Sequence, residues 1–369
     1  MFQNEHLYLV GLTMLKGAGN VLSRILLQYF GSAEDVFNTN RSLLEKIPGI
    51  GFNTAERIES TKTEALKRAE KELAFIDKNK IRLYTFPDED YPKRLKECHD
   101  APVVFYYKGN ANLDAAKIIS IVGTRRVTDY GRQQTEQLVK GLSDMFPELL
   151  VVSGLAYGTD ICAHKSALSN NLPTVGVLAH GLDRIYPSAH RNTAAEMIGQ
   201  GGLLTDFMSK TEPERENFLH RNRLIAGLAD ATVVVESAEK GGSLVTADIA
   251  FSYGRDVYAF PGRSIDEYSA GCNRLIQMNK AGLIGSAKDL IMSLCWDSDL
   301  KSQPRQASLS FSEKPDHPVI RLLEEKGEFH VNLLASEMNL PIHKLTSILF
   351  ELELEGHIKA LPGGIYKLT

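Results

Sequence analysis

The chain has 369 residues, of which 43% are hydrophobic and 24% are charged. This length predicts two or three domains, and the ordinary apolar fraction predicts a sizeable core and argues against global disorder. No apolar run approaches the roughly 18–20 residues of a membrane helix, which argues against an integral membrane protein. The formal net charge of −4 argues against binding nucleic acid through bulk positive charge, so any such site must be a local cluster of Arg and Lys.

The first residues, MFQNEHLYLVGL, lack a basic stretch followed by a clean apolar one, so we expect no signal peptide. The four cysteines are widely spaced and form no CxxC pair. This spacing argues against a zinc ribbon and a disulfide scaffold, and it fits a reducing compartment. We therefore expect a cytoplasmic protein.

Residues 1–80 are expected to form a domain of short helices separated by glycine turns. Within it, Leu44–Ile58 (LEKIPGIGFNTAERI) is typical of a helix-hairpin-helix, whose glycines let backbone amides approach a phosphate. Leu15–Gly19, followed by VLSRILLQYFGS, resembles a degenerate second copy. The 11 Lys and Arg of this region face 10 Asp and Glu, so DNA contact and a SAM-like packing role both stay open.

Residues 81–296 alternate apolar runs with segments that are mostly long enough for a helix. Near-continuous runs of Val, Ile and Leu are typical of strands buried on both faces, and βαβ alternation favours a parallel sheet. We therefore predict an α/β, Rossmann-like, mostly parallel sheet, to which Ile81–Phe86 and Val103–Tyr107 add edge strands. The five runs are Ile118–Val122, Leu149–Val152, Thr174–Ala179, Ala231–Val235 and Asp256–Phe260.

Glycine and polar residues follow each of these five runs. They are Gly-Thr-Arg-Arg after Val122, Ser-Gly-Leu-Ala-Tyr-Gly-Thr-Asp after Val152, His-Gly-Leu-Asp after Ala179, Glu-Ser-Ala-Glu-Lys-Gly-Gly-Ser after Val235, and Pro-Gly-Arg after Phe260. A single such glycine is best explained by a tight turn. Five loops at the carboxyl edge of an open sheet, where ligands and anions bind, instead favour an anion or nucleic-acid groove.

Common enzyme motifs are missing from this edge. The sequence has no GxxxxGK[ST], GxGxxG, HExxH or GxSxG, so we expect no cofactor, no metal ion and no catalytic residue. Ser153 and Ser243 lie in glycine-rich turns without an evident base. We interpret them as helix caps or as hydroxyls that face phosphates.

Arginines gather in two places. Guanidinium groups suit phosphate oxygens and stack on bases. Arg215 could instead pair with neighbouring glutamates on a solvated helix, whereas Arg221–Arg223 directly precede an apolar run, where two arginines and an amide need anionic or polar partners. The first cluster is Arg125, Arg126 and Arg132, and the second is Arg215, Arg221 and Arg223.

Several segments, in order over roughly 160 residues, carry a family resemblance. They are Val122–Arg125, Ser153–Asp160 with Ala163-His164, Gly181–Asp183 with Tyr186-Pro187, Phe218 with Arg221–Leu228, Gly242–Ala247, Pro261-Gly262 and Gly271–Ile276. Through these segments the middle region resembles the DprA/Smf family of DNA-processing proteins. Each segment alone is weakly specific, but the ordered set is very specific.

The resemblance implies a Rossmann-like domain that binds single-stranded DNA, forms a homodimer and hands the strand to the recombinase RecA during natural transformation, without catalytic turnover. Tyr130, Tyr157 and Phe218 could stack on bases, although a pocket wall or core position is favoured for Phe218. The expected DNA-binding residues are Gly123, Thr124, Arg125, Arg126, Ser153, Gly154, Tyr157, Arg215, Arg221, Asn222, Arg223, Lys240, Gly241, Gly242, Ser243 and Asn273.

Residues 297–315 are polar and contain Ser and Pro, which predicts a linker. Residues 316–369 are typical of a winged helix, with helices in HPVIRLLEEKG, HVNLLASEMN and PIHKLTSILFELELEG and a wing in HIKALPGGIYKLT that turns at Gly363-Gly364. This module has five Lys and Arg against eight Asp and Glu. Phosphate repulsion therefore disfavours duplex recognition and favours an accessory or protein-interaction role.

The sequence leaves two alternative functions to consider. A nucleotide hydrolase similar to phosphoribohydrolases of the lysine-decarboxylase-like group would need Pro-Gly-Gly-x-Gly-Thr-x-x-Glu, but Glu239–Asp248 has neither the initial Pro nor the catalytic Glu. A duplex-binding transcription factor would depend on the acidic winged helix alone. Base release from a nucleoside monophosphate would distinguish the hydrolase from a binding protein.

Deleting residues from about 300 onward is expected to leave single-strand affinity largely intact, because the removed module is acidic and joined through a polar linker. Gel shifts of the truncated and full chains would measure this, with circular dichroism to verify folding. A large loss of affinity in a folded truncation would assign the winged helix to the DNA site.

Overall fold

The computed structural model describes residues 2–297, 317–355, 357–361 and 364–368. It divides into two compact units, Met1–Asp297 and Ser298–Thr369, each of which is described by itself. Apart from Asp297, the predicted linker lies outside the described residues, as does Gly363 of the predicted wing turn. Within the described ranges, no helix combines the length and the apolar composition that crossing a membrane requires.

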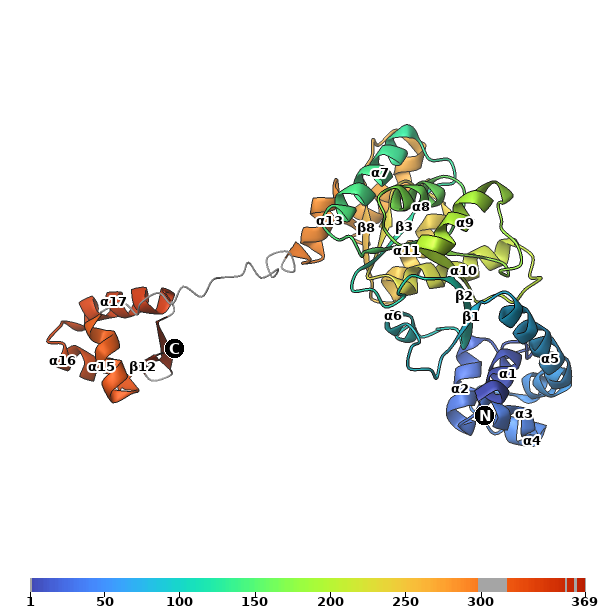
Figure 1. The fold of residues 1–369 in the computed structure, drawn as a ribbon, viewed down its shortest axis with the longest axis horizontal. Helices are drawn as coiled ribbons and strands as arrows, with labels where there is room; N and C mark the ends of the chain where they lie inside the picture. The colour runs from blue at the N-terminus through green and yellow to red at the C-terminus, as the bar shows by residue number, and fades with distance from the viewer. Residues whose placement is uncertain (1, 298–316, 356, 362–363, 369) are drawn as a thin grey trace. The chain divides into compact units, whose positions relative to one another are not determined.

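A mixed sheet forms the centre of the first unit (Figure 1). It has nine strands in the order β1-β2-β6-β5-β4-β3-β7-β8-β9. The pairs from β6 to β9 are parallel, whereas β1 and β2 pair antiparallel with each other and β2 pairs antiparallel with β6. The predicted α/β, mostly parallel fold is confirmed. The strands are β1 (Arg82–Thr85), β2 (Val104–Gly109), β3 (Ile118–Val122), β4 (Leu150–Ser153), β5 (Thr174–Val177), β6 (Gly201–Thr205), β7 (Ala231–Val234), β8 (Asp256–Ala259) and β9 (Gly282–Leu283).

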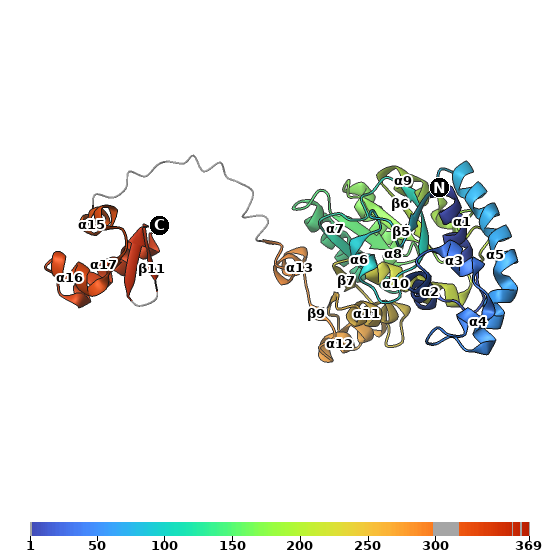
Figure 2. The same cartoon turned by 90° about the horizontal axis from the view of Figure 1, so that it is seen from below.

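Helices cover both faces of this sheet. One face carries α7 (Asp129–Ser143), α8 (Thr159–Ser169) and α9 (Arg191–Gln200), and the other carries α10 (Arg215–Leu228) and α11 (Gly242–Ser252) (Figure 2). The chain runs outward from β3 to β6 and returns through α10 to β7 on the other side of β3. The winding direction therefore reverses between β3 and β7, the switch point at which open α/β sheets bind ligands. Shorter elements complete this part: α6 (Lys93–Lys96), η1 (Ser188–His190), η2 (Glu267–Ser269), α12 (Ala270–Gln277) and α13 (Ala287–Ser293).

Strand β6 was not predicted, because its first two residues are glycines. Space in the sheet explains them: a Cβ at Gly201 would lie 2.0 Å from the carbonyl oxygen of Thr174, and one at Gly202 would lie 2.4 Å from the ring of Tyr107. Glycine normally weakens a strand, so the local pattern did not indicate one. The strand joins the antiparallel β1–β2 pair to the parallel sheet, which places β2 inside the sheet rather than at its edge.

Five helices precede the sheet: α1 (Phe2–Leu12), α2 (Asn20–Phe30), α3 (Ala33–Asn38), α4 (Arg41–Leu44) and α5 (Phe52–Lys78). The turns before α2 and α5 contain Gly17 (φ 93°) and Gly49 (φ 88°), in the left-handed region that glycine adopts without strain. The helical core continues into Val104 and Tyr106 of β2. The helices and the sheet are therefore parts of one compact unit.

The second unit has the winged-helix fold that the sequence predicts. Its helices pack on a small antiparallel sheet in the order β10-β12-β11, around a core that includes Leu323, Leu334, Leu345 and Leu349. The described elements are α15 (Pro318–Lys326), β10 (Phe329–His330), α16 (Val331–Glu337), α17 (Ile342–Leu354), β11 (Ile358–Leu361) and β12 (Ile365–Leu368).

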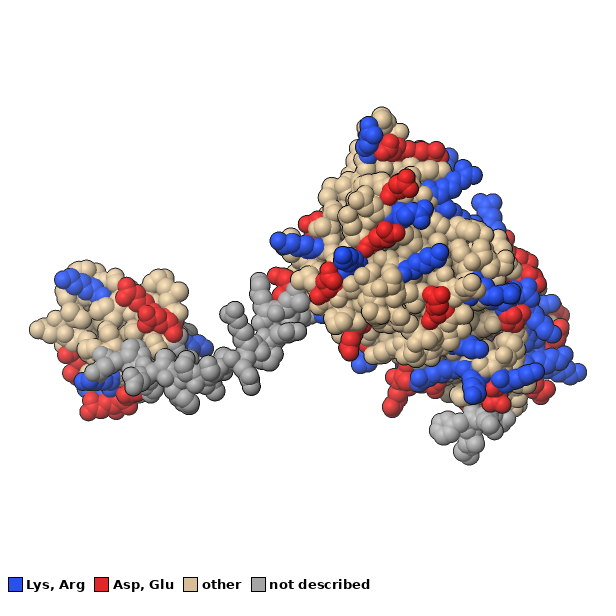
Figure 3. Space-filling view, turned by 45° about the horizontal axis from the view of Figure 1, so that its top comes forward, with Lys and Arg blue, Asp and Glu red and all other residues tan. Residues whose placement is uncertain are grey.

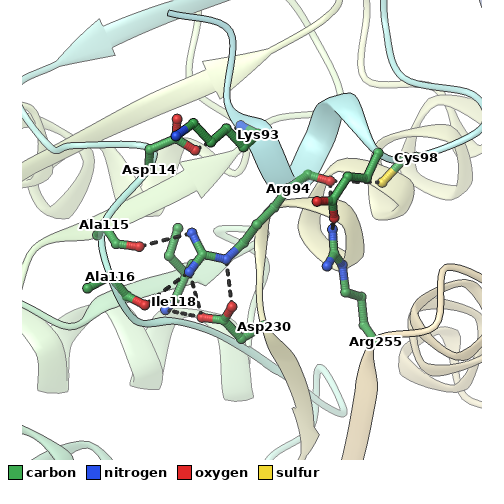
Figure 4. A network of polar contacts seen from close by, with 10 residues as sticks. Lys93, Arg94, Cys98, Asp114, Ala115, Ala116, Ile118, Asp230 and Arg255 are labelled. Atoms are coloured by element: carbon green, nitrogen blue, oxygen red, sulfur yellow. Dashed lines mark hydrogen bonds and ion pairs between the residues drawn. The ribbon is translucent and has the colours of Figure 1, made fainter. Parts of the chain in front are cut away.

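A largely buried ion pair ties the starts of β3 and β7 to α6 (Figure 4). The Arg94 guanidinium donates to both carboxylate oxygens of Asp230, at 2.6 and 3.0 Å, and to the carbonyl oxygens of Ala115 and Ala116. Asp230 also accepts the backbone N–H of Ile118 at 2.8 Å. This pair fixes the amino edge of the sheet, opposite to the edge at which the glycine loops lie.

Arg94→Ala is expected to destabilise the protein by about 2–3 kcal/mol, because it leaves a mostly buried carboxylate with only a backbone donor. Urea denaturation followed by circular dichroism would measure the change. The matched control Lys280→Ala removes the exposed pair with Asp248 and is expected to cost less than about 0.5 kcal/mol. Equal effects of the two substitutions would contradict a structural role for the buried pair.

Candidate nucleic-acid interface

The loop after β3, which carries Arg125 and Arg126, is anchored at the switch point by a buried carboxylate. Glu236, just after β7, accepts the backbone N–H of Thr128 at 2.9 Å and its hydroxyl at 2.5 Å. The carbonyl oxygen of Glu236 accepts the backbone N–H of Thr124 at 2.7 Å. These bonds hold both ends of the short loop, so the two arginines project from a fixed frame.

The loops after β3 and β4 touch each other through glycines. A Cβ at Gly123 would lie 2.3 Å from the hydroxyl of Thr159, and one at Gly158 would lie 2.2 Å from the carbonyl oxygen of Thr124. Gly158 also has a φ of 79°, which strains other residues. The glycines of this edge therefore allow close approach of two loops, in addition to making turns.

Arg221 crosses beneath these loops from α10. Only 4% of its surface is exposed. Its Nη1 donates to the carbonyl oxygen of Gly154 at 2.6 Å and to that of Val177, so one guanidinium holds the carboxyl ends of β4 and β5. A Cβ at Gly154 would lie 2.5 Å from this Nη1, which explains why glycine follows β4.

The positive charge of Arg221 is incompletely compensated. Among the described residues, no carboxylate lies within ion-pairing distance of it. Burial lowers the pKa of Arg221 to about 10; the carboxylate of Asp160 opposes this shift and the charge of Arg125 adds to it. Burial also lowers the pKa of nearby His164 to about 3, so that ring is neutral. At neutral pH, two like charges thus lie close together at the edge where an anion would enter.

One aromatic ring receives both guanidinium groups. The guanidinium carbons of Arg125 and Arg221 lie 5.2 and 5.8 Å from the centre of the Phe218 ring. Phe218 is partly buried, which fits the wall or core position favoured for it from the sequence. Tyr186, 47% exposed, packs edge-on against Phe218 at 5.9 Å. In the sequence, the Tyr186-Pro187 pair was the one signal that pointed to Tyr186, and it indicated no role for the ring.

Three of the arginines expected to bind DNA are exposed, and none has an ion pair among the described residues. Over the described part of the chain, Arg125, Arg126 and Arg215 have no carboxylate at ion-pairing distance. The alternative pairing of Arg215 with Glu212 is absent, because Glu212 binds Arg184 at 2.5 Å. Figure 3 shows blue and red side chains interspersed over the visible face of the first unit, so that face has no unbroken basic field. Basicity at the site is thus a property of a few residues.

The loops after β7 and β8 form a second group. Lys240 is exposed and unpaired among the described residues, and Gly241 and Gly242 lead into α11. Ser243 donates to the hydroxyl of Ser237 at 2.9 Å, and both amide atoms of Asn273 bind the backbone of Gly262. The polar groups of Ser243 and Asn273 are therefore engaged in holding the loops.

Other expected residues bind within the fold. Arg223 forms a buried ion pair with Asp206 and donates to the carbonyl oxygen of Asp100. Asn222 accepts from Arg221 at 3.2 Å, and Ser153 donates to the carbonyl oxygen of Ile121 at 2.6 Å. Tyr157 is 50% exposed and packs edge-on against His190. The structure thus brings together Gly123, Thr124, Arg125, Gly154 and Arg221, and separates Arg223 from them by its engagement with Asp206 and Asp100.

Comparison with known proteins agrees with this architecture. Residues 82–295 match the family described as DNA recombination-mediator protein A, and residues 303–364 match the DprA winged helix domain. Protein Smf of Synechocystis is 33% identical over 301 residues, which cover 80% of this chain and 74% of that protein. DNA processing protein DprA of Streptococcus pneumoniae is 38% identical over 213 residues, which cover 58% of this chain and 74% of that protein.

Solved structures are similar as well. The X-ray structure of DprA from Streptococcus pneumoniae has a TM-score of 0.64 at 31% identity and covers 78% of this chain and 97% of that one. DNA processing protein A from Helicobacter pylori, solved for insight into its single-stranded DNA binding mode, has a TM-score of 0.53 at 30% identity, with 58% of this chain and 97% of that one covered. Together, these matches show that the chain belongs to the DprA/Smf family of DNA processing proteins.

Proposed function

We propose that this protein binds single-stranded DNA at the carboxyl edge of its sheet. The observation that carries the proposal is that Arg125 and Arg221 lie over one aromatic ring, Phe218, and neither has a carboxylate partner among the described residues. A phosphate would supply the missing negative charge. The single-stranded DNA binding of the Helicobacter pylori relative supports the same ligand here.

In this proposal, the arginines contact the phosphates of the strand and the aromatic rings contact its bases. Arg125 and Arg126 would contact phosphate oxygens from the anchored loop, and Arg221 would contribute its charge from below. The rings of Phe218 and the exposed Tyr186 would take unstacked bases, which every sequence offers and a duplex hides. Binding would therefore favour single strands and depend little on sequence.

The family description supports a proposal for the process in which this activity takes part. The matched family is described as a recombination mediator, which supports a role in delivering incoming DNA to a recombinase. We propose RecA as that recombinase, a homodimer formed through the Rossmann-like region, natural transformation as the process, and the cytoplasm as the location. For the helix-hairpin-helix, DNA contact and a packing role both stay open.

A binding role is favoured over nucleotide hydrolysis. In the segment that most resembles a hydrolase motif, Glu239 pairs with Arg274 at 3.1 Å and Asp248 pairs with Lys280 at 2.7 Å, and all four side chains are exposed. A general acid or base needs a desolvated position beside its substrate. These surface pairs do not have that environment.

Fluorescence anisotropy with a labelled oligonucleotide tests the proposal. We expect the single strand to bind more tightly than the matching duplex in the same buffer, with little difference between mixed sequences of equal length. A nucleoside monophosphate incubated with the protein should release no free base. Equal or tighter duplex binding, or base release at a catalytic rate, would contradict the proposed function.

Arg125→Ala should weaken single-strand binding and reduce the slope of log affinity against log salt by about 0.7, the share of one phosphate contact. The melting temperature should be unchanged, because Arg125 is exposed and has no ion pair among the residues described. Arg82→Ala makes the same charge change at the distant edge strand β1 and serves as the control. An unchanged slope in a stable Arg125→Ala protein would remove Arg125 from the interface.

A further inference from the structure

A cavity of about 640 Å³ lies between the N-terminal helices and the segment that follows β1. This volume is in the range of small-molecule sites, which often form where two parts of a fold meet. Strand β1 is the edge strand of the sheet, and β2, β6 and β5 separate it from β4. The cavity is therefore distinct from the proposed DNA interface.

Apolar side chains form two of its walls. On α2, Val21 and Ile25 are one helical turn apart and 48% and 39% exposed. Phe86 and Pro87 line the cavity from the segment after β1, and buried Leu9 lines it from α1. Such a slot suits the flat or apolar body of a ligand.

Two cations lie together on the same cavity wall. The Arg24 guanidinium carbon is 4.4 Å from the centre of the Phe86 ring, and the Lys96 nitrogen is 5.5 Å from it. Arg24 Nη1 donates to the carbonyl oxygens of Cys98 and His99 at 3.0 Å, and Lys96 Nζ donates to a carbonyl at 3.3 Å. Neither has a carboxylate partner within the described residues, and each keeps further N–H groups free to donate.

Two carboxylates also line this cavity, and each is held in place by a backbone N–H. Glu5 accepts the backbone N–H of Ala33 at 2.9 Å, and Asp88 accepts that of Thr85 at 3.2 Å.

We propose that this cavity binds an organic phosphate with a flat, largely apolar body, of the nucleoside monophosphate class. The phosphate would lie against Arg24 and Lys96, and the base would lie between the apolar side chains of α2 and Pro87. Arg24 belongs to α2 and Lys96 to α6, so a bound phosphate joins the N-terminal helices to the sheet. The ligand thereby stabilises the packing of these two parts.

Isothermal titration of the full chain with AMP tests this site, with adenosine and inorganic phosphate as separate probes. We expect saturable binding of one AMP to the cavity and at least tenfold weaker binding of either fragment. Lys96→Gln and Ile25→Glu should each weaken AMP binding about tenfold or more, because they remove a cation and the apolar wall, whereas Lys96→Arg should retain it. Thermal melts would verify that the variants fold. If Ile25→Glu does not fold, AMP binding by Lys96→Gln alone tests the site.

Arg125→Ala separates this cavity from the DNA interface, which could also take a nucleotide. AMP binding that survives Arg125→Ala but is lost in Lys96→Gln would support the proposal, and single-strand binding should be unchanged in Lys96→Gln. Loss of AMP binding in Arg125→Ala alone would mean that the DNA interface is the nucleotide site. That result, or the absence of saturable binding up to about 1 mM, would overturn the proposal.

Discussion

Arg221 places a positive charge inside the sheet domain, and much of the candidate site depends on how that charge is accommodated. Its guanidinium is held by the carbonyl oxygens of Gly154 and Val177, at the ends of β4 and β5. A buried cation needs polar partners, and these carbonyls provide dipoles without cancelling the charge. The close approach of the Arg221 guanidinium to the backbone requires a glycine, Gly154, directly after β4. The same contact fixes the position of α10, which also carries Phe218.

The second fixed point is Glu236 at the switch point. Its carboxylate binds the N–H and hydroxyl of Thr128, which caps α7, while its carbonyl binds Thr124. A short loop held at both ends loses little entropy when it binds a ligand. Arg125 and Arg126 are thus presented on an anchored turn, where an acidic protein can concentrate positive charge locally.

The remaining parts of the chain differ in charge and in their relation to the sheet. The N-terminal helices share their core with β2, and Arg24 bonds to the carbonyl oxygens of Cys98 and His99 across the cavity between them. The winged helix has its own core, and its third helix, α17, carries Glu351 and Glu353 against Lys344. Phosphate repulsion at that helix is a physical reason not to assign it to the proposed DNA interface.

The sequence by itself determined the fold class and pointed to the carboxyl edge of the sheet for the candidate site. Runs of Val, Ile and Leu such as Ile118–Val122 predict strands, because a strand that is buried on both faces needs apolar side chains at every position. A glycine-containing loop follows each of these runs in the sequence. The sequence did not reveal β6. Its two glycines, at 201 and 202, are required because a larger residue would clash with Thr174 and Tyr107, which are distant in the chain.

Tertiary structure decided which polar residues remain available to a ligand. Arg221 and Arg223 are two residues apart, yet their charges differ in how far they are neutralised. Arg223 forms an ion pair with Asp206, whereas Arg221 donates to backbone carbonyls and is influenced by the carboxylate of Asp160 without an ion-pairing contact among the described residues. Asn273, equally promising in sequence, has both amide atoms bound to Gly262. The residue type determines what a side chain can bind. Whether its charge or polar group is still available to a ligand depends on the partners that only the folded chain brings within hydrogen-bonding distance.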